Sequence, residues 1–276
     1  MHVIKEFVEK IKVSRFNFII LLMLITLMVS IIFIKGNSRA ASDNSKQIIV
    51  TDVIETINLS ANSEGKVIVI DPGHGSEWDM SLEPLAPGSS RKRVKSPVGA
   101  VGSFTNIPEY KVDWDVALKL KKLLEDKGFI VVMTKDSIEE NPSGIERAEL
   151  GNKANARLVV RIHADSFEDK RVYGTTILVP EALSDDRKSL SEESSRCANI
   201  ILNKLENNAG VKGRGVVLRG DLTAFNWSNV PTLLIEMGFL SNEKEDRLLN
   251  TDDYQNKLAR VIADGIEEAV KIEWNK

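Results

Sequence analysis

Residues 66–75 read KVIVIDPGHG, and the architecture of the rest of the chain follows from this stretch. It begins as a short apolar run and ends at a Pro-Gly turn, which is typical of a buried strand. His74 follows the end of this predicted strand. Because ligands bind beside the carboxyl ends of strands in open parallel sheets, we expect His74 to lie in a functional site.

Helices and strands alternate downstream of this stretch. The spacing of apolar residues and capping signals predict helices over 110–127, 143–156, 190–208 and 251–271, with a shorter helix starting at Asn242. Strands are predicted over 129–134, 157–162, 172–179, 215–218 and 232–236. This order predicts an α/β domain over residues 64–276, with a mainly parallel sheet covered by helices.

Residues 75–108 interrupt the alternation. They contain several Gly and Pro residues and show no clear periodicity, so we expect an irregular loop. Loops of this length are uncommon and often functional. The basic residues Arg91, Lys92, Arg93 and Lys95 within it are expected to be solvated, with contact to an anionic partner as the alternative.

Composition excludes several classes of protein. The 276 residues carry a net charge of −3, which argues against general nucleic-acid binding. The single cysteine, Cys197, excludes an intramolecular disulfide framework and a cysteine-rich metal site, so we expect it to be a small structural residue. The mixed charges and the 42% of hydrophobic residues make a wholly disordered chain unexpected.

The N-terminal part has the pattern of a membrane anchor. Residues 16–34 carry no charge and would span about 28 Å as a helix, close to the thickness of a bilayer core. The preceding residues 1–15 are basic and are predicted to be a cytoplasmic tail. Residues 35–63 are predicted to be a linker to an extracytoplasmic domain in a single-pass cell-membrane protein. A cleaved signal sequence, which would give a secreted protein, is the alternative.

Polar side chains capable of binding a metal ion stand at the ends of three predicted strands. They are His74, His163 and Glu236. Two imidazoles and one carboxylate are typical protein ligands of a catalytic zinc ion, and a further carboxylate can act as a base beside it. Hydrogen-bonded structural residues are the alternative interpretation. The third histidine, His2, lies in the predicted cytoplasmic tail and cannot join this group.

The residues alone leave the ligand carboxylate open. The acidic residues within reach of the first connection are Glu77, Asp79, Glu83, Glu109, Asp113 and Asp115. Glu109 is preferred among them because it opens the predicted helix at the edge of the sheet, near the positive end of the helix.

Four segments, in this order, resemble the zinc-dependent N-acetylmuramoyl-L-alanine amidases of the amidase-3 family: VIVIDPGHG, PEYKVDWDVALKLKKLLEDKGFIVVMTK, ERAELGNKANARLVVRIHADS and VPTLLIEMGFLSNEKEDRLL. The resemblance covers residues 66–270. It implies a mixed, mainly parallel sheet flanked by helices. It also implies zinc held by His74, Glu109 and His163, with Glu236 as general base.

The implied reaction is hydrolysis of the amide bond between N-acetylmuramic acid and L-alanine, so the implied partners are the glycan and the stem peptide of peptidoglycan. A non-catalytic wall-binding or regulatory module and a zinc peptidase are the alternatives. Because no separate wall-binding repeat is visible, we expect targeting through the anchor or through a partner protein.

Several residues depart from the family pattern or have no assigned role. Ser76 replaces a usual glycine, Arg161 a usual small residue and Asp165 a usual asparagine. Asp71 is expected to fix the turn or to support the metal site rather than to bind the metal. Asp165 and Asn226 are further candidates for contact with the substrate or the metal site, and packing is the alternative for Asn226.

Overall fold

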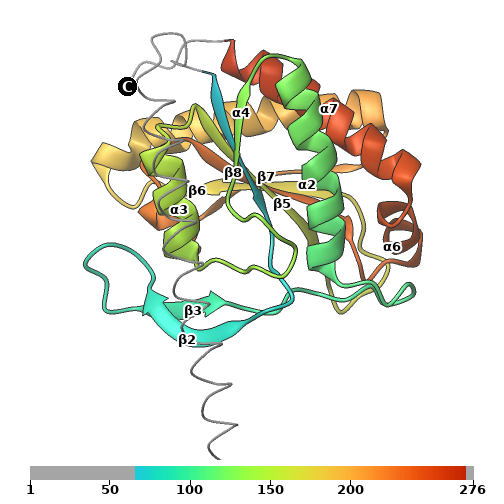
Figure 1. The fold of residues 1–276 in the computed structure, drawn as a ribbon, viewed down its shortest axis with the longest axis horizontal. Helices are drawn as coiled ribbons and strands as arrows, with labels where there is room; N and C mark the ends of the chain where they lie inside the picture. Colours follow the sequence, from blue (N-terminus) through green and yellow to red (C-terminus); the bar gives the residue numbers. More distant parts are fainter. Residues whose placement is uncertain (1–65, 272–276) are drawn as a thin grey trace, which may run out of the picture. The chain divides into compact units, whose positions relative to one another are not determined.

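The computed structural model describes residues 66–271 (Figure 1). The predicted cytoplasmic tail, membrane anchor and linker therefore lie outside the described residues. Within residues 66–271, no helix has the length and apolar character needed to cross a membrane.

A six-stranded sheet forms the centre of the described part, in the strand order β4-β1-β5-β8-β6-β7. The strands are β1 (Val67–Pro72), β4 (Ile130–Met133), β5 (Leu158–Asp165), β6 (Thr175–Pro180), β7 (Gly213–Arg219) and β8 (Thr232–Phe239). β4, β1, β5 and β8 are mutually parallel, whereas β6 runs antiparallel to β8 and carries β7 parallel to itself. The expectation of a mixed, mainly parallel sheet is confirmed.

Helices cover both faces of the sheet. The main ones are α2 (Glu109–Asp126), α3 (Gly144–Lys153), α4 (Lys188–Lys204), α5 (Thr223–Trp227), α6 (Glu243–Leu249) and α7 (Asp252–Val270). Short turns of other helix types occupy Asp185–Arg187 and Leu205–Ala209. In Figure 1, α2 and α7 lie together on one side of the sheet and α3 lies on the other.

The main hydrophobic core joins one face of the sheet to α2, α4 and α7. Ile68, Ile70 and Ile162 of the sheet are fully buried there, and Cys197 of α4 lies in the same core. Each fully buried aliphatic side chain contributes about 1.5–3 kcal/mol to folding. On the other face, Phe225 of α5 packs with buried leucines of β6 and β8.

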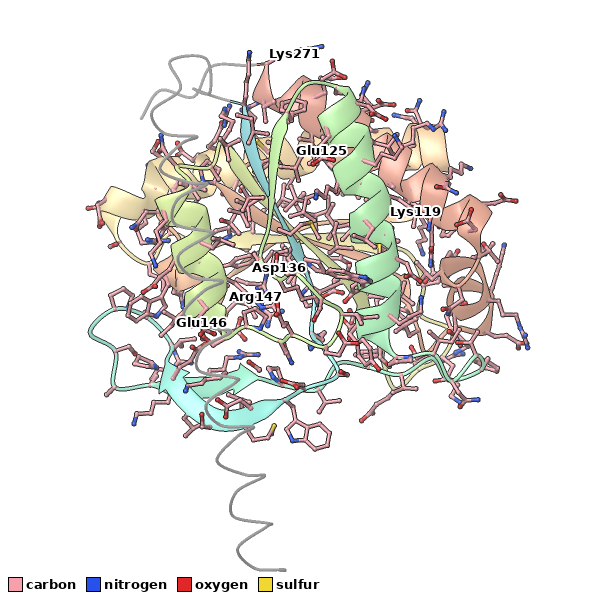
Figure 2. All side chains as sticks on the ribbon, in the orientation of Figure 1. Lys119, Glu125, Asp136, Glu146, Arg147 and Lys271 are labelled. Carbon is pink, nitrogen blue, oxygen red and sulfur yellow. The ribbon has the colours of Figure 1, made fainter. Side chains whose placement is uncertain are left out.

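Local signals explain where two of the helices begin. The Ser143 side chain accepts a hydrogen bond from the backbone N–H of Glu146, and the Glu146 side chain (labelled in Figure 2) accepts one in return, so a capping box opens α3. At the predicted start of α6, the Asn242 side chain accepts hydrogen bonds from the backbone N–H groups of Lys244 and Glu245. The Glu245 carboxylate accepts from the N–H groups of Gly174 and Phe239 instead of completing a capping box. The predicted long closing helix is also confirmed, as α7.

Residues 75–108 correct the expectation of an irregular loop. They contain an antiparallel hairpin of β2 (Asp79–Pro84) and β3 (Lys92–Ser96). Trp227 Nε1 donates to the Pro84 carbonyl at 3.1 Å, which joins the hairpin to α5. Polar and apolar residues alternate over residues 79–83 of β2, but the apolar Met80 and Leu82 are exposed and the polar Glu83 is buried. This short pattern therefore does not indicate a strand with an apolar face against the core.

Candidate metal centre and active site

The polar residues predicted at strand ends come together at one edge of the sheet. His74 follows β1, His163 lies in β5 and Glu236 in β8, while Glu109 is the first residue of α2. β5 and β8 are neighbours, and their register pairs His163 with Glu236. The parallel order of β1, β5 and β8 therefore brings together side chains that lie far apart in the sequence.

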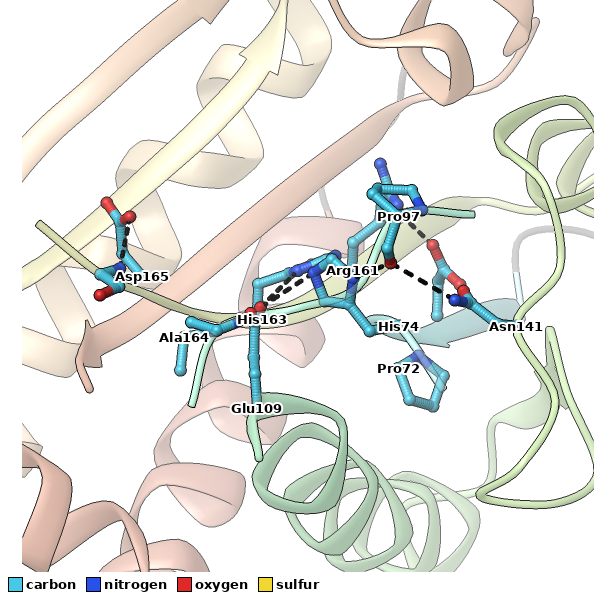
Figure 3. Close-up of polar contacts among 12 residues, drawn as sticks. Pro72, His74, Pro97, Glu109, Asn141, Arg161, His163, Ala164 and Asp165 are labelled. Carbon is cyan, nitrogen blue, oxygen red and sulfur yellow. Dashed lines mark hydrogen bonds and ion pairs between the residues drawn. The ribbon is translucent and has the colours of Figure 1, made fainter. Parts of the chain in front are cut away.

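His74, Glu109 and His163 form a compact group of potential metal ligands. Glu109 Oε1 lies 3.2 Å from His74 Nε2 and 3.0 Å from His163 Nδ1. One ligand atom from each of the three residues lies within 4.8 Å of the others. The two imidazole rings meet edge to face, with their centroids 5.0 Å apart (Figure 3). Three potential ligand atoms this close to one another could hold a metal ion.

The backbone and the ring of His74 are both held in place. Its φ of 51° lies in the left-handed region, which is uncommon for a residue with a side chain. Lys135 Nζ donates to the His74 carbonyl at 2.5 Å. The Nδ1 atom of the ring lies 2.9 Å from the Pro97 carbonyl oxygen. Since that oxygen can only accept, Nδ1 carries the proton, which leaves Nε2, 3.2 Å from Glu109 Oε1, as the ring atom available to bind a metal ion.

The charge of Glu109 is stabilised within a buried site. Glu109 Oε2 accepts a hydrogen bond of 2.7 Å from the Ala100 N–H. Burial by itself would raise the pKa of this carboxyl, but the hydrogen bonds to His163 and His74 outweigh it and hold the pKa well below its usual range. Glu109 is therefore a carboxylate at neutral pH, as a metal ligand must be.

His163 is buried against a glycine. A Cβ on Gly73 would lie 2.5 Å from His163 Cε1 and 2.6 Å from Asp113 Oδ2, so only glycine allows this close approach. Burial lowers the pKa of His163 to about 4, even though Glu109 opposes the shift. A neutral imidazole is the form that binds a metal ion.

Two further carboxyls beside this group have buried oxygens without hydrogen-bond partners. They are Glu236, through Oε2, and Asp113, through both oxygens. Burial, reinforced by the charge of Glu109, raises the pKa of both well above the usual range. Negative charge without partners is costly in a buried place unless a cation or a proton compensates it. The site is therefore electrostatically prepared for a cation.

Asp71 lies behind the group of metal-binding residues and belongs to a different network. Arg161 Nε donates to Asp71 Oδ2 at 2.6 Å, Arg147 Nη1 pairs with Oδ1, and Thr134 Oγ1 donates to Oδ1 at 2.5 Å. Burial would raise the pKa of Asp71, but these two arginines hold it far below its usual range. This arrangement agrees with the expected supporting role of Asp71.

A pocket opens onto the metal-binding group. Its lining consists of His74, Val98, Gly99, Ala100, Glu109, His163, Ala164, Asp165, Ser166 and Glu236. Asp165, a predicted candidate, is thus on the pocket wall, where burial and the charge of Glu109 raise its pKa. Asn226 is not part of this lining. Its Nδ2 donates to the Leu85 and Gly220 carbonyls at 3.1 Å each, which supports the packing alternative.

Sequence reasoning missed part of the site. Asp113 was considered only as an alternative ligand, although its position four residues after Glu109 places it one turn further on the same helix face. The contacts of Pro97 with His74 and of Arg147 with Asp71 had no sequence signal, because the partners are 23 and 76 residues apart.

An α/β fold that brings together His74, Glu109 and His163, with the Glu236 carboxyl nearby, has a residue set that could hold a metal ion in a hydrolase. The chain belongs to the N-acetylmuramoyl-L-alanine amidase family (Amidase_3), whose model matches residues 68–268. The resemblance noted from the sequence is thereby confirmed.

Individual relatives agree with this assignment. The chain is 23% identical to N-acetylmuramoyl-L-alanine amidase Rv3717 of Mycobacterium tuberculosis, over 78% of this chain and 91% of that protein. The amidase Ami1 of Mycobacterium smegmatis shares the fold with a TM-score of 0.69 at 23% identity, over 76% of this chain and 99% of that one. The CwlD amidase of Clostridioides difficile, solved in complex with the GerS lipoprotein, matches with a TM-score of 0.56 and 27% identity, over 75% of this chain and 100% of that one.

Members of this family hydrolyse the bond between N-acetylmuramic acid and L-alanine in peptidoglycan during cell-wall remodelling. The chain is accordingly an enzyme of the N-acetylmuramoyl-L-alanine amidase class, as its sequence predicts.

Proposed function

We propose that the chain hydrolyses the muramoyl-L-alanine amide with a zinc ion held by His74, Glu109 and His163. The observation that carries this proposal is the group of three potential ligand atoms within 4.8 Å of one another, beside the partnerless Glu236 carboxyl. Two nitrogen donors and one oxygen donor fit the ligand preference of catalytic zinc, which keeps a further position open. When bound, zinc supplies a Lewis acid and lowers the pKa of a coordinated water.

Glu236 is the proposed general base. It lies on the pocket wall with His74, Glu109 and His163, so its carboxyl faces the place where the attacking water and the scissile amide meet. A cation bound beside Glu236 would favour its carboxylate form, which can accept a proton and then donate it. The Glu236 carboxylate takes the proton from the water and delivers it to the leaving nitrogen of L-alanine.

The walls of the pocket would orient the substrate. Val98, Gly99 and Ala100 form one wall, and Ala164, Asp165 and Ser166 form another. We assign the contact with the N–H groups or cationic groups of the stem peptide to Asp165, because its carboxyl is the acidic group of the wall that is not otherwise used. The Asp165 carboxyl accepts only a local hydrogen bond of 2.7 Å from the Ser166 N–H.

The reaction can be tested on purified peptidoglycan with the full chain. We expect new L-alanine amino termini, peptide-free glycan and intact stem peptides in the mass spectrum of the products. A chelator should stop the release, and added zinc should restore it. Cleavage inside the stem peptide would indicate a peptidase instead, and zinc binding without any cleavage would favour the non-catalytic module.

For location, we propose a single-pass membrane anchor at residues 16–34 with the catalytic domain outside the membrane. The uncharged stretch of 19 residues at 16–34 supports the anchor proposal. Because the CwlD amidase of Clostridioides difficile was solved in complex with the GerS lipoprotein, we also propose a protein partner for targeting. Fractionation of cells that express the full chain tests the anchor. Recovery of the chain only in the culture medium would favour the cleaved signal sequence.

A further inference from the structure

The end of the 75–108 insert runs directly over the proposed metal ligands. We call residues 96–100 the strap. The Pro97 carbonyl of the strap accepts the hydrogen bond from His74 Nδ1 at 2.9 Å. The Ala100 N–H donates to Glu109 Oε2 at 2.7 Å, and the Glu109 N–H donates back to the Ala100 carbonyl at 2.9 Å. Backbone groups of the strap thus contact two of the three proposed ligands.

Gly99 shows how closely the strap approaches these ligands. A Cβ at this position would lie 2.8 Å from Glu109 Oε2 and 2.8 Å from His74 Cδ2. Real Cβ atoms do not come this close to other heavy atoms, so the strap can lie here only because residue 99 is a glycine. The position of the strap and the positions of the two ligands therefore depend on one another.

The strap is fixed on its other side by the loop before α3. Ser96 is 3% exposed, and its hydroxyl donates to the Asn141 carbonyl at 2.6 Å. Asn141 Nδ2 donates to the Glu77 carbonyl at 3.0 Å and reaches the Pro97 carbonyl at 3.4 Å, a contact drawn in Figure 3. Asn141 therefore ties together the two ends of the hairpin, where the insert leaves and rejoins the site.

Asn141 is itself anchored in the buried charged network. Arg147 Nη2 donates to Asn141 Oδ1 at 3.0 Å, and the same guanidinium pairs with Asp71. A continuous series of polar contacts then leads from Asp71 through Arg147, Asn141 and Pro97 to the ring of His74. Asp71 and Arg147 of this series are buried and Asn141 and His74 are half-buried, and each of these side chains is held in its orientation by a neighbour.

We propose that the strap is the outer support of the metal centre and that Ser96 and Asn141 are positioning residues, which set the orientation of His74 and Glu109 through it. This inference rests on the metal site of the proposed function. The hydrogen bond from a ligand histidine to a backbone carbonyl fixes its tautomer and its ring direction. Loss of such outer contacts weakens metal binding by about 10–100-fold in other metal sites.

Metal affinity of the full chain, measured with zinc alone against a competing chelator, tests the inference. Asn141→Asp keeps the oxygen that Arg147 binds but replaces the amide donor with an acceptor facing backbone carbonyls. Ser96→Ala removes the other attachment. We expect each variant to bind zinc about 10-fold more weakly. Matched controls are Ser90→Ala on the exposed part of the same insert and Asn199→Asp on the exposed face of α4, both with unchanged affinity.

Two further readouts separate positioning from a general structural role. The melting temperature of the metal-free variants reports loss of fold, and the visible spectrum of the cobalt-loaded variants reports the geometry of the ligands. An altered spectrum at an unchanged melting temperature supports the inference. Wild-type zinc affinity in Asn141→Asp and Ser96→Ala would overturn it, as would weaker binding explained entirely by a lower melting temperature.

Because these readouts are independent of peptidoglycan, failure of the proposed reaction is distinguishable from failure of the strap. Gly99→Ala provides a third variant should Ser96→Ala fail to fold. Its added methyl group pushes the strap away from His74 and Glu109, and we expect weaker zinc binding here too. Unchanged zinc affinity in a folded Gly99→Ala would contradict the inference.

Discussion

Two groups of buried carboxyls lie at the carboxyl edge of the sheet, and they differ in their hydrogen-bond partners. The first is Asp71 with its arginines, and the second is Asp113 and Glu236. Asp71 is fully buried, and both of its oxygens are bound by Arg147, Arg161 and Thr134. Asp113 is also fully buried, yet neither of its oxygens has a hydrogen-bond partner. The pKa of the first carboxyl is lowered and that of the second is raised.

The difference separates support from function. A buried charge with all its partners in place holds backbone elements together, here the end of β1 and α3. Carboxyls with unused oxygens, such as Asp113 and Glu236, lower the stability of the metal-free fold and persist because they serve a ligand. The comparison predicts that variants in the first group lower the stability of the fold. Variants in the second group should change activity or metal binding and should not destabilise the metal-free protein.

The largest effect is expected at Glu236. Glu236→Gln keeps the shape of the side chain and removes the proton acceptor, so the rate of amide hydrolysis should fall by about 10²–10⁴-fold. Zinc affinity should remain near that of the wild type, because Glu236 is not one of the three proposed ligands. Rate measurements on peptidoglycan with chelator competition in parallel check both points. The exposed Glu192→Gln in α4 is the control, and full activity in Glu236→Gln would remove that residue from the mechanism.

A large loss of stability is expected at Asp71. Asp71→Asn leaves the charge of the buried Arg147 without its partner, which should lower the free energy of unfolding by about 3–5 kcal/mol. Denaturant unfolding of the metal-free protein measures this loss in the free energy of unfolding. Asp169→Asn, which breaks an ion pair with Arg171 at the surface, should have a much smaller effect. Equal effects in the two variants would show that the Asp71 network has no special role.

The opposite sign is expected at Asp113. Asp113→Asn removes a buried charge that has no partner, so the metal-free protein should gain about 1–3 kcal/mol of stability. Zinc should bind more weakly, because a negative charge near the cation is lost. Unfolding curves with and without zinc measure the two changes. A destabilised metal-free variant would show that Asp113 is as well satisfied as Asp71.

The smallest effect is a dependence of stability on pH that differs between the groups. The pKa of Asp71 is lower in the folded state than in the unfolded state, so the unfolded state binds more protons. The stability that Asp71 contributes is therefore present at higher pH and is lost as pH falls below about 3.8. The pKa values of Glu236 and Asp113 are higher in the folded state, so the folded state binds more protons. The folded state is therefore relatively more stable at low pH, and this stability is lost as pH rises above about 4.5.

The free energy of unfolding of the metal-free protein, followed from pH 3 to 8, should therefore rise and then decline. Saturating zinc should remove the decline, because the cation compensates the carboxylates. Glu236→Gln should reduce the decline without zinc. A decline of equal size in the presence of zinc would contradict this assignment of the unpartnered carboxyls.

Much of the fold was predictable because its signals are local. The apolar run of β1, the spacing in α7 and the capping residues before α3 and α6 are all readable from neighbouring residues. The antiparallel direction of β6 was not, because its neighbour β8 follows it by more than fifty residues. The hairpin in the insert was missed because its strands are short and mostly exposed, and the apolar Met80 and Leu82 of β2 do not pack on the core.

The part of the site that lies at the ends of strands was predictable from the sequence. His163 and Glu236 follow from the parallel sheet, since the register pairs them directly. The choice of Glu109 needed the family resemblance, because five other acidic residues were available within the same connection. Asn141 could not be found, since its contacts depend on how the insert folds back over the site.

The single cysteine in the core also makes the molecule convenient to measure. Cys197 lies on the buried face of α4, and burial raises the pKa of its thiol to about 11. A thiol reagent can therefore modify the folded chain only when this part of the core opens. The rate at which the reagent labels Cys197 therefore reports the rate at which this part of the core opens. Because Cys197 does not react in the folded chain, single cysteines introduced at the surface can carry spectroscopic probes without removal of Cys197.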